Sequence, residues 1–276
     1  MAEITAAAVK SLRDKTGLPM MECKKALKEV DGDEDAAIRA LREAGKKLGE
    51  IRKDRATSEG RIAVHFNANS GAMIELQCES APVASHEEFI ALANDLARQL
   101  ATGPGAATPD ELLAQPSPSR EGMTLGDVKD DLFNRIREVL NLARIVRIDA
   151  PCGGYTHHAG VTKGVLLEIE GGSAEAAKDI CMHITATDPT VIHKEDLDPA
   201  EVDKERQILS EAARKEGKPE NILEKMVEGR MRQFYATKVL CEQPFVKDDT
   251  QTVAKYAEGA NIKLVRFVSW ELGRDG

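Results

Sequence analysis

The residues of this 276-residue sequence that could take part in chemistry are few and scattered. The densest group lies in CGGYTHH, where Cys152, His157 and His158 could serve a zinc-dependent enzyme. However, adjacent histidines on an extended chain point in different directions, and no fourth ligand is evident. We therefore interpret this stretch as a solvated glycine-rich turn and predict no metal and no cofactor. An enzyme that uses these three residues is kept as an alternative.

Common catalytic motifs do not occur in the sequence. It contains neither of the glycine-rich phosphate-binding patterns, G-x-x-x-x-G-K-S/T and G-x-G-x-x-G, and neither G-x-S-x-G nor H-E-x-x-H. The pairs Gly153-Gly154 and Gly171-Gly172 are interpreted as turns. His183, in DICMHITATDP, is interpreted as a helix residue at a surface or a packing boundary. These observations favour a protein that works through its surfaces and is not an enzyme.

The composition narrows the class of partner. A formal charge of −9 disfavours a protein whose main partner is nucleic acid, because phosphate binding draws on clustered Lys and Arg. The five cysteines are scattered without a C-x-x-C pair, as expected for reduced, mostly buried thiols. No apolar run approaches the roughly 18 residues of a membrane helix, and MAEITAAAVK lacks the pattern of a signal peptide. We expect a cytoplasmic protein that does not enter a membrane.

Residues 1–45 have the pattern of three short helices. The first ends at Gly17, the second follows Pro19, and the third stops at Gly45. A unit this small has a marginal core, which predicts either support from a partner or close packing of its periodic apolar residues, Leu12, Leu27, Val30, Ile38 and Leu41. Residues 46–60 are highly charged and are interpreted as an exposed tether.

The rest of the chain repeats one order of elements. In residues 61–150, RIAVHF and AMIELQC predict an antiparallel hairpin, followed by a helix, a mobile Pro- and Ser-rich excursion over 102–122, a second helix and a strand. In residues 151–276 the order starts again, with a charged helical insertion at about 195–235. NIKLVRF from Asn261 resembles NLARIVRI from Asn141. The sequence thus predicts an α+β core of two related sheet-plus-helix subdomains.

One segment carries a specific family resemblance. VKSLRDKTGLPMMECKKALKEVDGDEDAAIRALREAG closely resembles the opening module of the elongation factor Ts family, guanine-nucleotide exchange factors for elongation factor Tu. The resemblance resumes in GKPENILEKMVEGRMRQFYATKVLCEQPFVKDDTQTV and, more loosely, around CMHITATDP. It implies a ubiquitin-associated-like N-terminal module, a tether, and a core of two antiparallel subdomains. It also implies exchange by binding alone, with elongation factor Tu as the partner and no cofactor or direct nucleic-acid contact.

The resemblance also assigns contact residues. In the N-terminal module, the positions that match the family's contact face on the GTPase are Leu12, Met20, Met21 and Lys24. In the second subdomain, His183, Phe245 and Val246 match further positions near the partner.

One loop departs from the family pattern. The family usually carries Thr-Asp-Phe-Val-Ala where this chain has Ser80-Ala81-Pro82-Val83-Ala84, and its Asp and Phe reach into the partner beside the magnesium site. Either Pro82 on a rigid turn still pushes the partner's helices apart, with Val83 and the other contacts carrying the exchange, or the chain is a diverged copy that binds but exchanges poorly. A third hypothesis is a structural or chaperone-like binding protein, which would bind without changing the nucleotide off-rate.

Overall fold

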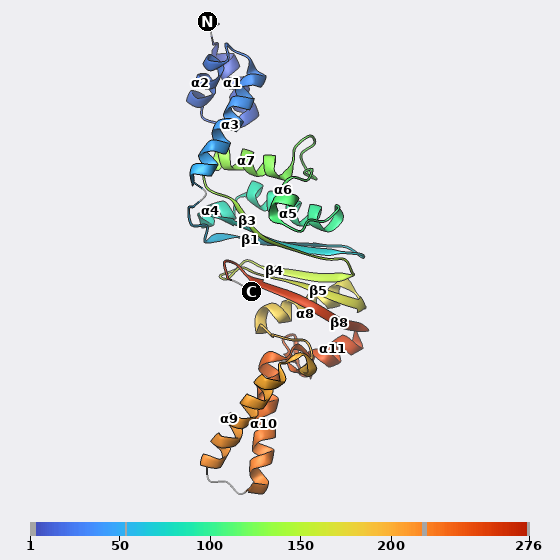
Figure 1. The fold of residues 1–276 in the computed structure, drawn as a ribbon. Helices are drawn as coiled ribbons and strands as arrows, with labels where there is room; N and C mark the ends of the chain where they lie inside the picture. Colours follow the sequence, from blue (N-terminus) through green and yellow to red (C-terminus); the bar gives the residue numbers. More distant parts are fainter. Residues whose placement is uncertain (1–3, 53, 217–219, 275–276) are drawn as a thin grey trace.

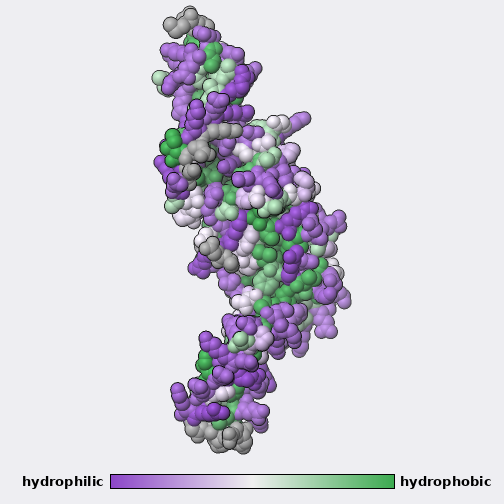
Figure 2. Space-filling view, in the orientation of Figure 1, coloured by the Kyte–Doolittle hydropathy of each residue, from purple (hydrophilic) through white to green (hydrophobic). Residues whose placement is uncertain are grey.

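The computed structural model describes residues 4–52, 54–216 and 220–274, which form an elongated α+β molecule (Figure 1). Two three-stranded antiparallel sheets lie face to face in the middle, with three helices at one end and a helical hairpin at the other. Hydrophobic residues gather over the sheets on the visible face, and both ends are mainly hydrophilic (Figure 2). The predicted α+β class is confirmed. Of the helices described, none has the length and apolar character required to cross a bilayer.

The three N-terminal helices predicted from the sequence are present. They are α1 (Ala6–Thr16), α2 (Met20–Glu29) and α3 (Glu34–Arg52). Thr5 caps α1 by accepting the Ala8 N–H at 3.2 Å, and Gly17 ends it in a left-handed conformation at φ +69°. The apolar faces meet in a small core whose buried members are Val9, Leu12, Leu18, Cys23, Ala26, Leu27 and Ala37. The other predicted core residues pack against it partly exposed, namely Val30, Ile38 and Leu41.

The third helix does not stop at Gly45 but continues to Arg52, so part of the segment expected as a tether is helical. The cause is tertiary, because α3 lies against α7 (Leu125–Ile136). A Cβ on Gly45 would lie 1.7 Å from Asn134 Oδ1, so the glycine allows the two helices to approach closely. Arg52 extends the contact by donating from Nη1 to the carbonyl oxygen of Arg137 at 2.8 Å.

The first sheet has the order β1-β2-β3 and contains the predicted hairpin. Its strands are β1 (Glu59–Phe66), β2 (Gly71–Cys78) and β3 (Asn141–Ile148). One face packs on α5 (Glu87–Thr102) and the other on the second sheet. Alternation along β2 sends Ile74 and Leu76 toward the helices and Met73 toward the second sheet. Burial on both faces explains why this strand reads as an almost continuous apolar run.

The second sheet has the order β4-β5-β8. Its strands are β4 (Cys152–His157), β5 (Lys163–Gly171) and β8 (Ile262–Glu271), and its outer face is covered by α8 (Ala174–Thr187), with α11 (Val253–Gly259) beside it. The interpretation of CGGYTHH as a solvated turn is therefore wrong, since most of it is strand β4. Gly171 is the last paired residue of β5 and Gly172 follows it at a bend, with φ of +75° and +70°, so the interpretation of this pair as a turn is only partly correct.

The two sheets share a detailed irregularity. The pairing of β2 with β3 shifts register between Glu75 and Leu76, and the pairing of β5 with β8 shifts between Glu168 and Ile169. At each bulge the glutamate pairs with an arginine, Arg144 in the first sheet and Arg266 in the second. The next pair is also equivalent in the two sheets. Leu142 pairs with Leu76 in the first sheet, and Leu264 pairs with Ile169 in the second. The two segments that resemble each other, NLARIVRI and NIKLVRF, thus occupy β3 and β8, with Arg144 equivalent to Arg266.

Glycine residues allow the two sheets to stack closely. A Cβ on Gly154 would lie 2.5 Å from Val64 Cγ1, and a Cβ on Gly164 would lie 2.3 Å from Ile62 Cγ2. On the other face of β4, a Cβ on Gly153 would lie 2.5 Å from the Ala177 Cβ of α8. The interpretation of Gly153-Gly154 as a turn is corrected here, because both are strand residues that permit close approach from either face.

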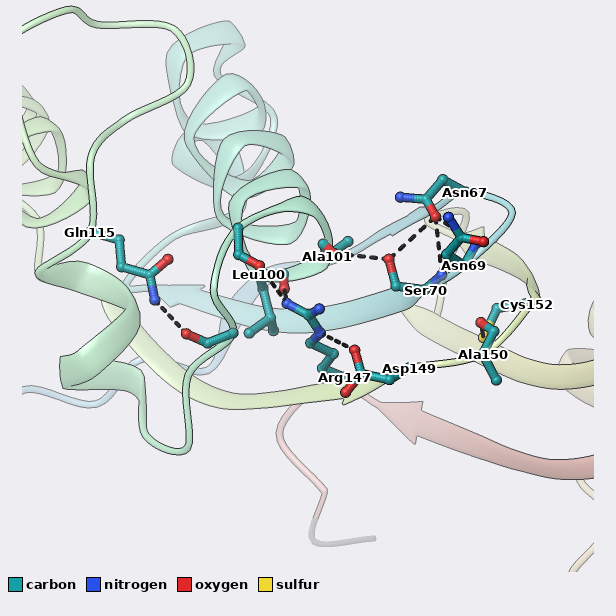
Figure 3. A network of polar contacts seen from close by, with 12 residues as sticks. Asn67, Asn69, Ser70, Leu100, Ala101, Gln115, Arg147, Asp149, Ala150 and Cys152 are labelled. Atoms are coloured by element: carbon teal, nitrogen blue, oxygen red, sulfur yellow. Dashed lines mark hydrogen bonds and ion pairs between the residues drawn. The ribbon is translucent and has the colours of Figure 1, made fainter.

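The segment 102–122, expected to be mobile, is held to the body at several points. Arg147 Nη1 donates to the carbonyl oxygens of Leu100 and Gly103, both at 2.8 Å, and Ser70 Oγ donates to that of Ala101 at 2.8 Å (Figure 3). These bonds satisfy the last carbonyls of α5. The short helix α6 (Pro109–Leu113) then buries Leu112 completely in the core of the first subdomain. The buried side chain of Leu112 and the local hydrogen bonds thus hold in place a segment whose composition is typical of a loop.

The predicted helical insertion is a hairpin of α9 (Pro199–Lys215) and α10 (Glu220–Lys238) that projects from the second subdomain (Figure 1). Its buried contacts are few and centre on Ala213, Val227 and Met231. A parallel bridge between Val191 and Val239 joins its base to the body. The flanking short elements are η1 (Lys194–Asp196), η2 (Leu240–Glu242), β6 (Pro244–Phe245) and β7 (Asp248–Thr252).

The paired bulges provide a matched test of buried against exposed ion pairs. Glu75 is 1% exposed and bonds Arg144 Nε at 2.8 Å, the Gln77 amide at 2.7 Å and the Gly273 N–H at 3.1 Å. Arg144→Met leaves this carboxylate buried without its cation and is expected to lower the free energy of unfolding by about 3–5 kcal/mol. Arg266→Met removes the equivalent pair, whose arginine side chain is 61% exposed, and should cost about 0–1 kcal/mol. Urea unfolding measures both, and equal small losses would contradict the assignment.

The crossing of α3 and α7 provides a second matched pair. Gly45→Ala forces Asn134 or the helix to move and should lower the free energy of unfolding by about 1–3 kcal/mol, which outweighs the better helix propensity of alanine. Gly49→Ala on the same helix meets only Phe133 at 3.8 Å and should stabilise by about 0.5–1 kcal/mol. Thermal and urea unfolding of the two variants decide the point. Stabilisation by both would show that α3 does not need glycine at the crossing.

Candidate functional site

The first exposed surface lies at the start of α2. Met20 and Met21 are 46% and 76% exposed, and Lys24, one turn further, is also exposed. The opposite side of α2 is buried in the module core through Cys23, Ala26 and Leu27. Because methionine adapts its shape and buries apolar area readily, this surface suits contact with another protein.

Leu12 does not belong to that surface. Its exposed fraction is 0%, and it lies in the core of the module. The expectation that Leu12 touches the partner is therefore corrected, because Leu12 lies on α1 and can act only by supporting α2, the helix that carries Met20 and Met21. Helical periodicity in the sequence already placed it on the apolar face of α1, which was the correct signal.

The second exposed surface is the turn after β2. Ser80 is the N-cap of the single-turn helix α4 (Ala81–Ala84), and Ala81 and Pro82 are exposed. Val83, expected to carry part of the contact, is 8% exposed and packs in the core of the first subdomain. The turn thus presents only a methyl group and a proline ring, on a helical turn anchored by Val83 and Ala84.

The two surfaces are joined by polar bonds through the connection between α7 and β3. Arg137 forms an ion pair with Glu22, the neighbour of Met21 on α2. Glu138 accepts a hydrogen bond from Ser80 Oγ at 2.7 Å through its Oε1. In Figure 1 α2 and α4 lie on the same side of the view. No local pattern signals this link, because residues 22, 80 and 137–138 are far apart along the chain.

The predicted contact residues of the second subdomain divide into buried and exposed ones. His183 is 0% exposed and Phe245 is 1% exposed, so neither can touch a partner in this conformation, and both expectations are corrected. Phe245 stacks on Tyr256 with ring centroids 4.2 Å apart. Val246 alone is exposed, at 49%. The buried pair therefore shapes the loop that presents Val246.

Val246 borders an apolar groove of about 570 Å³ that the sequence reasoning missed. The groove runs between the β4–β5 connection and α8, and its apolar lining includes Tyr155, Val161, Met182, Ala186 and Val246. A signal existed, since Met182 is next to His183 and one of two adjacent helix residues must face outward. Val161 is 50% exposed and extends the apolar area.

His183 holds the Val246 loop by two hydrogen bonds. The Val246 N–H donates to Nδ1 at 3.2 Å, so Nδ1 carries no proton, and Nε2–H donates to Gln243 Oε1 at 2.8 Å. Burial lowers the pKa of His183 from its ordinary value, and the bond to Gln243 offsets part of this effect. The imidazole is therefore neutral near pH 7, as this hydrogen-bond pattern requires.

The Cys/His alternative fails on geometry. Cys152 and His157 are five residues apart on β4, about 16 Å, and point to opposite faces of the sheet. Cys152 lies between the sheets, where burial raises its pKa to about 11, whereas His157 lines the groove on the α8 side. Over the described ranges, no three His, Cys, Asp or Glu side chains are arranged to bind one metal ion. These residues do not form one site.

The chain is an elongated α+β protein, with a three-helix module and a helical hairpin at opposite ends of a two-sheet core. The family model described as elongation factor TS matches residues 79–274. The elongation factor Ts of Thioalkalivibrio sulfidiphilus is 40% identical, over 98% of this chain and 92% of its own length. That of Micrococcus luteus is 40% identical over 99% of this chain and all of its own length. The chain belongs to the elongation factor Ts family of translation elongation factors.

The neutral state of His183 predicts a pH dependence of stability. Because its folded pKa lies below the unfolded value of about 6.5, the unfolded chain takes up a proton first as the pH falls. Stability should decline below about pH 6.5 by at most about 1.4 kcal/mol per pH unit from this residue, until the folded pKa is reached. His183→Asn keeps an acceptor for the Val246 N–H and should flatten the curve. Urea unfolding between pH 5 and 7.5 tests this, and parallel curves would refute it.

Proposed function

We propose that this protein is a guanine-nucleotide exchange factor that binds elongation factor Tu in its GDP form, disturbs its magnesium and phosphate site, and promotes GDP release. Family membership supports the class of activity. The observation that carries the proposal for this chain is the pairing of two exposed surfaces, Met20-Met21-Lys24 on α2 and Ala81-Pro82 on α4, both backed by buried residues.

The mechanism requires only binding. A factor that holds the nucleotide-free GTPase more tightly than the GDP-bound form lowers GDP affinity by the same coupling free energy, typically about 1–3 kcal/mol. Surfaces with fixed spacing can supply that difference, because they fit one conformation of the partner better than another. The apolar groove beside Val246 adds a third contact in the second subdomain.

The turn at Ala81-Pro82 decides how the exchange is divided among the contacts. Without an aromatic ring, this turn forgoes the burial of a Phe-sized side chain, which is worth about 1.5–3 kcal/mol. Support for retained exchange comes from the rigidity of α4, which is anchored by Val83 in the core and by the Ser80–Glu138 bond. The small Ala81 side chain, which offers no carboxylate, supports the second candidate, a diverged copy that binds but exchanges poorly.

The deciding measurement is the release rate of a fluorescent GDP analogue from the same organism's elongation factor Tu at fixed magnesium. We expect the native chain to accelerate release, and Met21→Ala to raise the half-saturating concentration about tenfold through loss of an exposed apolar contact. Ile208→Ala is the matched control, because Ile208 is 50% exposed on α9 at the other end of the molecule.

The double substitution Ala81→Asp with Pro82→Phe separates the two candidates in the same assay. If the other contacts carry the exchange, the native chain is active and the double variant is only modestly faster. Binding of the native chain without acceleration, together with rescue by the double variant, would establish the diverged binder and overturn the exchange proposal.

A further inference from the structure

Three consecutive residues bond the immediate neighbours of both exposed surfaces in the first half of the molecule. They form the short connection between α7 and β3, where the side chain of Arg137 pairs with Glu22 of α2. Glu138 Oε1 accepts from Ser80 Oγ at 2.7 Å, and the Val139 N–H donates to Glu79 Oε1 at 2.8 Å. One short piece of backbone therefore links Glu22, the residue beside Met21, to Ser80, the residue before Ala81.

The backbone of Arg137 is unusual. Its φ is +65°, the left-handed conformation that closes α7, and its N–H donates to the Phe133 carbonyl at 2.7 Å. Glycine is the usual residue in such a position, since a side chain there is strained. Arginine supplies what glycine cannot, a guanidinium that reaches Glu22. Its carbonyl oxygen also accepts from Arg52 at the end of α3, so two helices of the module bond this one residue.

The carboxylate of Glu138 is also unfavourable for local stability. Its Oε1 holds Ser80, but its Oε2 is buried and has no hydrogen-bond partner among the residues that the structure describes. A buried acceptor without a donor is unfavourable. We therefore look to the hydrogen bond of the other oxygen, Oε1, for the reason that a glutamate occupies this position. That oxygen fixes the start of α4, while Val83 and Ala84 fix its end in the core.

We propose that Arg137 and Glu138 are positioning residues for the proposed exchange reaction. Arg137 holds α2 through Glu22, and Glu138 holds α4 through Ser80. Because one peptide bond joins the two residues, the docking surfaces on α2 and α4 keep a single spacing. The effect on exchange rests on the proposed function, whereas the coupling of α2 to α4 is a property of the chain alone.

The decisive variant is Arg137→Gly, because glycine suits the left-handed backbone and removes only the side chain. We expect its melting temperature to equal or exceed that of the native chain, while the half-saturating concentration for GDP release rises about fivefold to tenfold. If the arginine were merely structural, the variant would be as active as the native chain. Unchanged exchange in a folded Arg137→Gly variant overturns the role of Arg137.

Glu22→Gln tests the same contact from the other side. Glu22 lies beside Met21 and could touch the partner itself, and a double-mutant cycle separates the two effects. We expect Glu22→Gln with Arg137→Gly to be no worse than either single variant. Additive losses would show that Glu22 acts on the partner directly and would overturn the positioning role of the pair.

The Glu138–Ser80 bond is tested by conservative rescue. Ser80→Ala and Glu138→Ala are each expected to lower the maximal release rate about fivefold with little change in half-saturation, since the turn still docks but is poorly placed. Glu138→Gln keeps an oxygen acceptor for Ser80 and should restore the native maximal rate. Equal loss in Glu138→Gln and Glu138→Ala would overturn the assignment of Glu138 as a positioning residue.

Hydrogen–deuterium exchange of the free chain separates this proposal from the exchange function. In Arg137→Gly we expect faster amide exchange both in α2 and in residues 80–86, and no change in the groove segment around Val161. If the native chain failed to accelerate GDP release but showed this joint loosening, the proposed function would fall and the coupling would stand. Loosening confined to α2 would overturn the coupling.

Discussion

The rest of the structure depends on the close face-to-face contact of the two sheets. Stacked sheets normally lie about 10 Å apart, filled by side chains from both inner faces. Here Gly154 and Gly164 remove side chains where Ile62 and Val64 approach, so a branched residue of one sheet packs directly on the backbone of the other. The contact makes one rigid body of two halves, and both the N-terminal module and the helical hairpin are built out from it.

That rigidity changes how the contact residues should be understood. Among the positions matched to the family's contact residues, the exposed ones are Met20, Met21, Lys24, Ala81, Pro82 and Val246, and buried neighbours hold them in place. Leu12 supports the first two, Val83 anchors Pro82, and His183 with Phe245 holds Val246. Residues matched to a family's contact sites therefore include exposed side chains and the buried side chains that support them. Burial separates these two roles where sequence similarity does not.

The sequence predicted what local pattern controls. The three N-terminal helices, the Gly17 cap and the hairpin of β1 and β2 depend on periodicity and turn chemistry within a few residues. Prediction from the sequence failed where contact with a distant element determines the structural role of a residue. Gly45 carries the signal of a helix end, and Gly153-Gly154 that of a turn, but each is a place where another element passes close by. Likewise, the composition of residues 102–122 favours a mobile loop, and a single buried leucine with an arginine at the end of α5 orders it. The link through Arg137 and Glu138 joins three separate stretches of chain and has no local signature.

The repeated glutamate–arginine pair at the two bulges has an evolutionary consequence. If the halves descend from one duplicated unit, Glu75–Arg144 and Glu168–Arg266 began as the same pair. The stacked sheets enclose the first pair, whereas the arginine of the second pair is 61% exposed, so the two pairs would be under unequal selection. In the Glu168–Arg266 pair, either residue could be replaced alone at little cost in stability. In the Glu75–Arg144 pair, replacement of either residue alone leaves a buried group without its partner and destabilises the protein. Only a simultaneous change of both residues avoids this loss. On this argument, the same ion pair resists single replacement in the first half and tolerates it in the second.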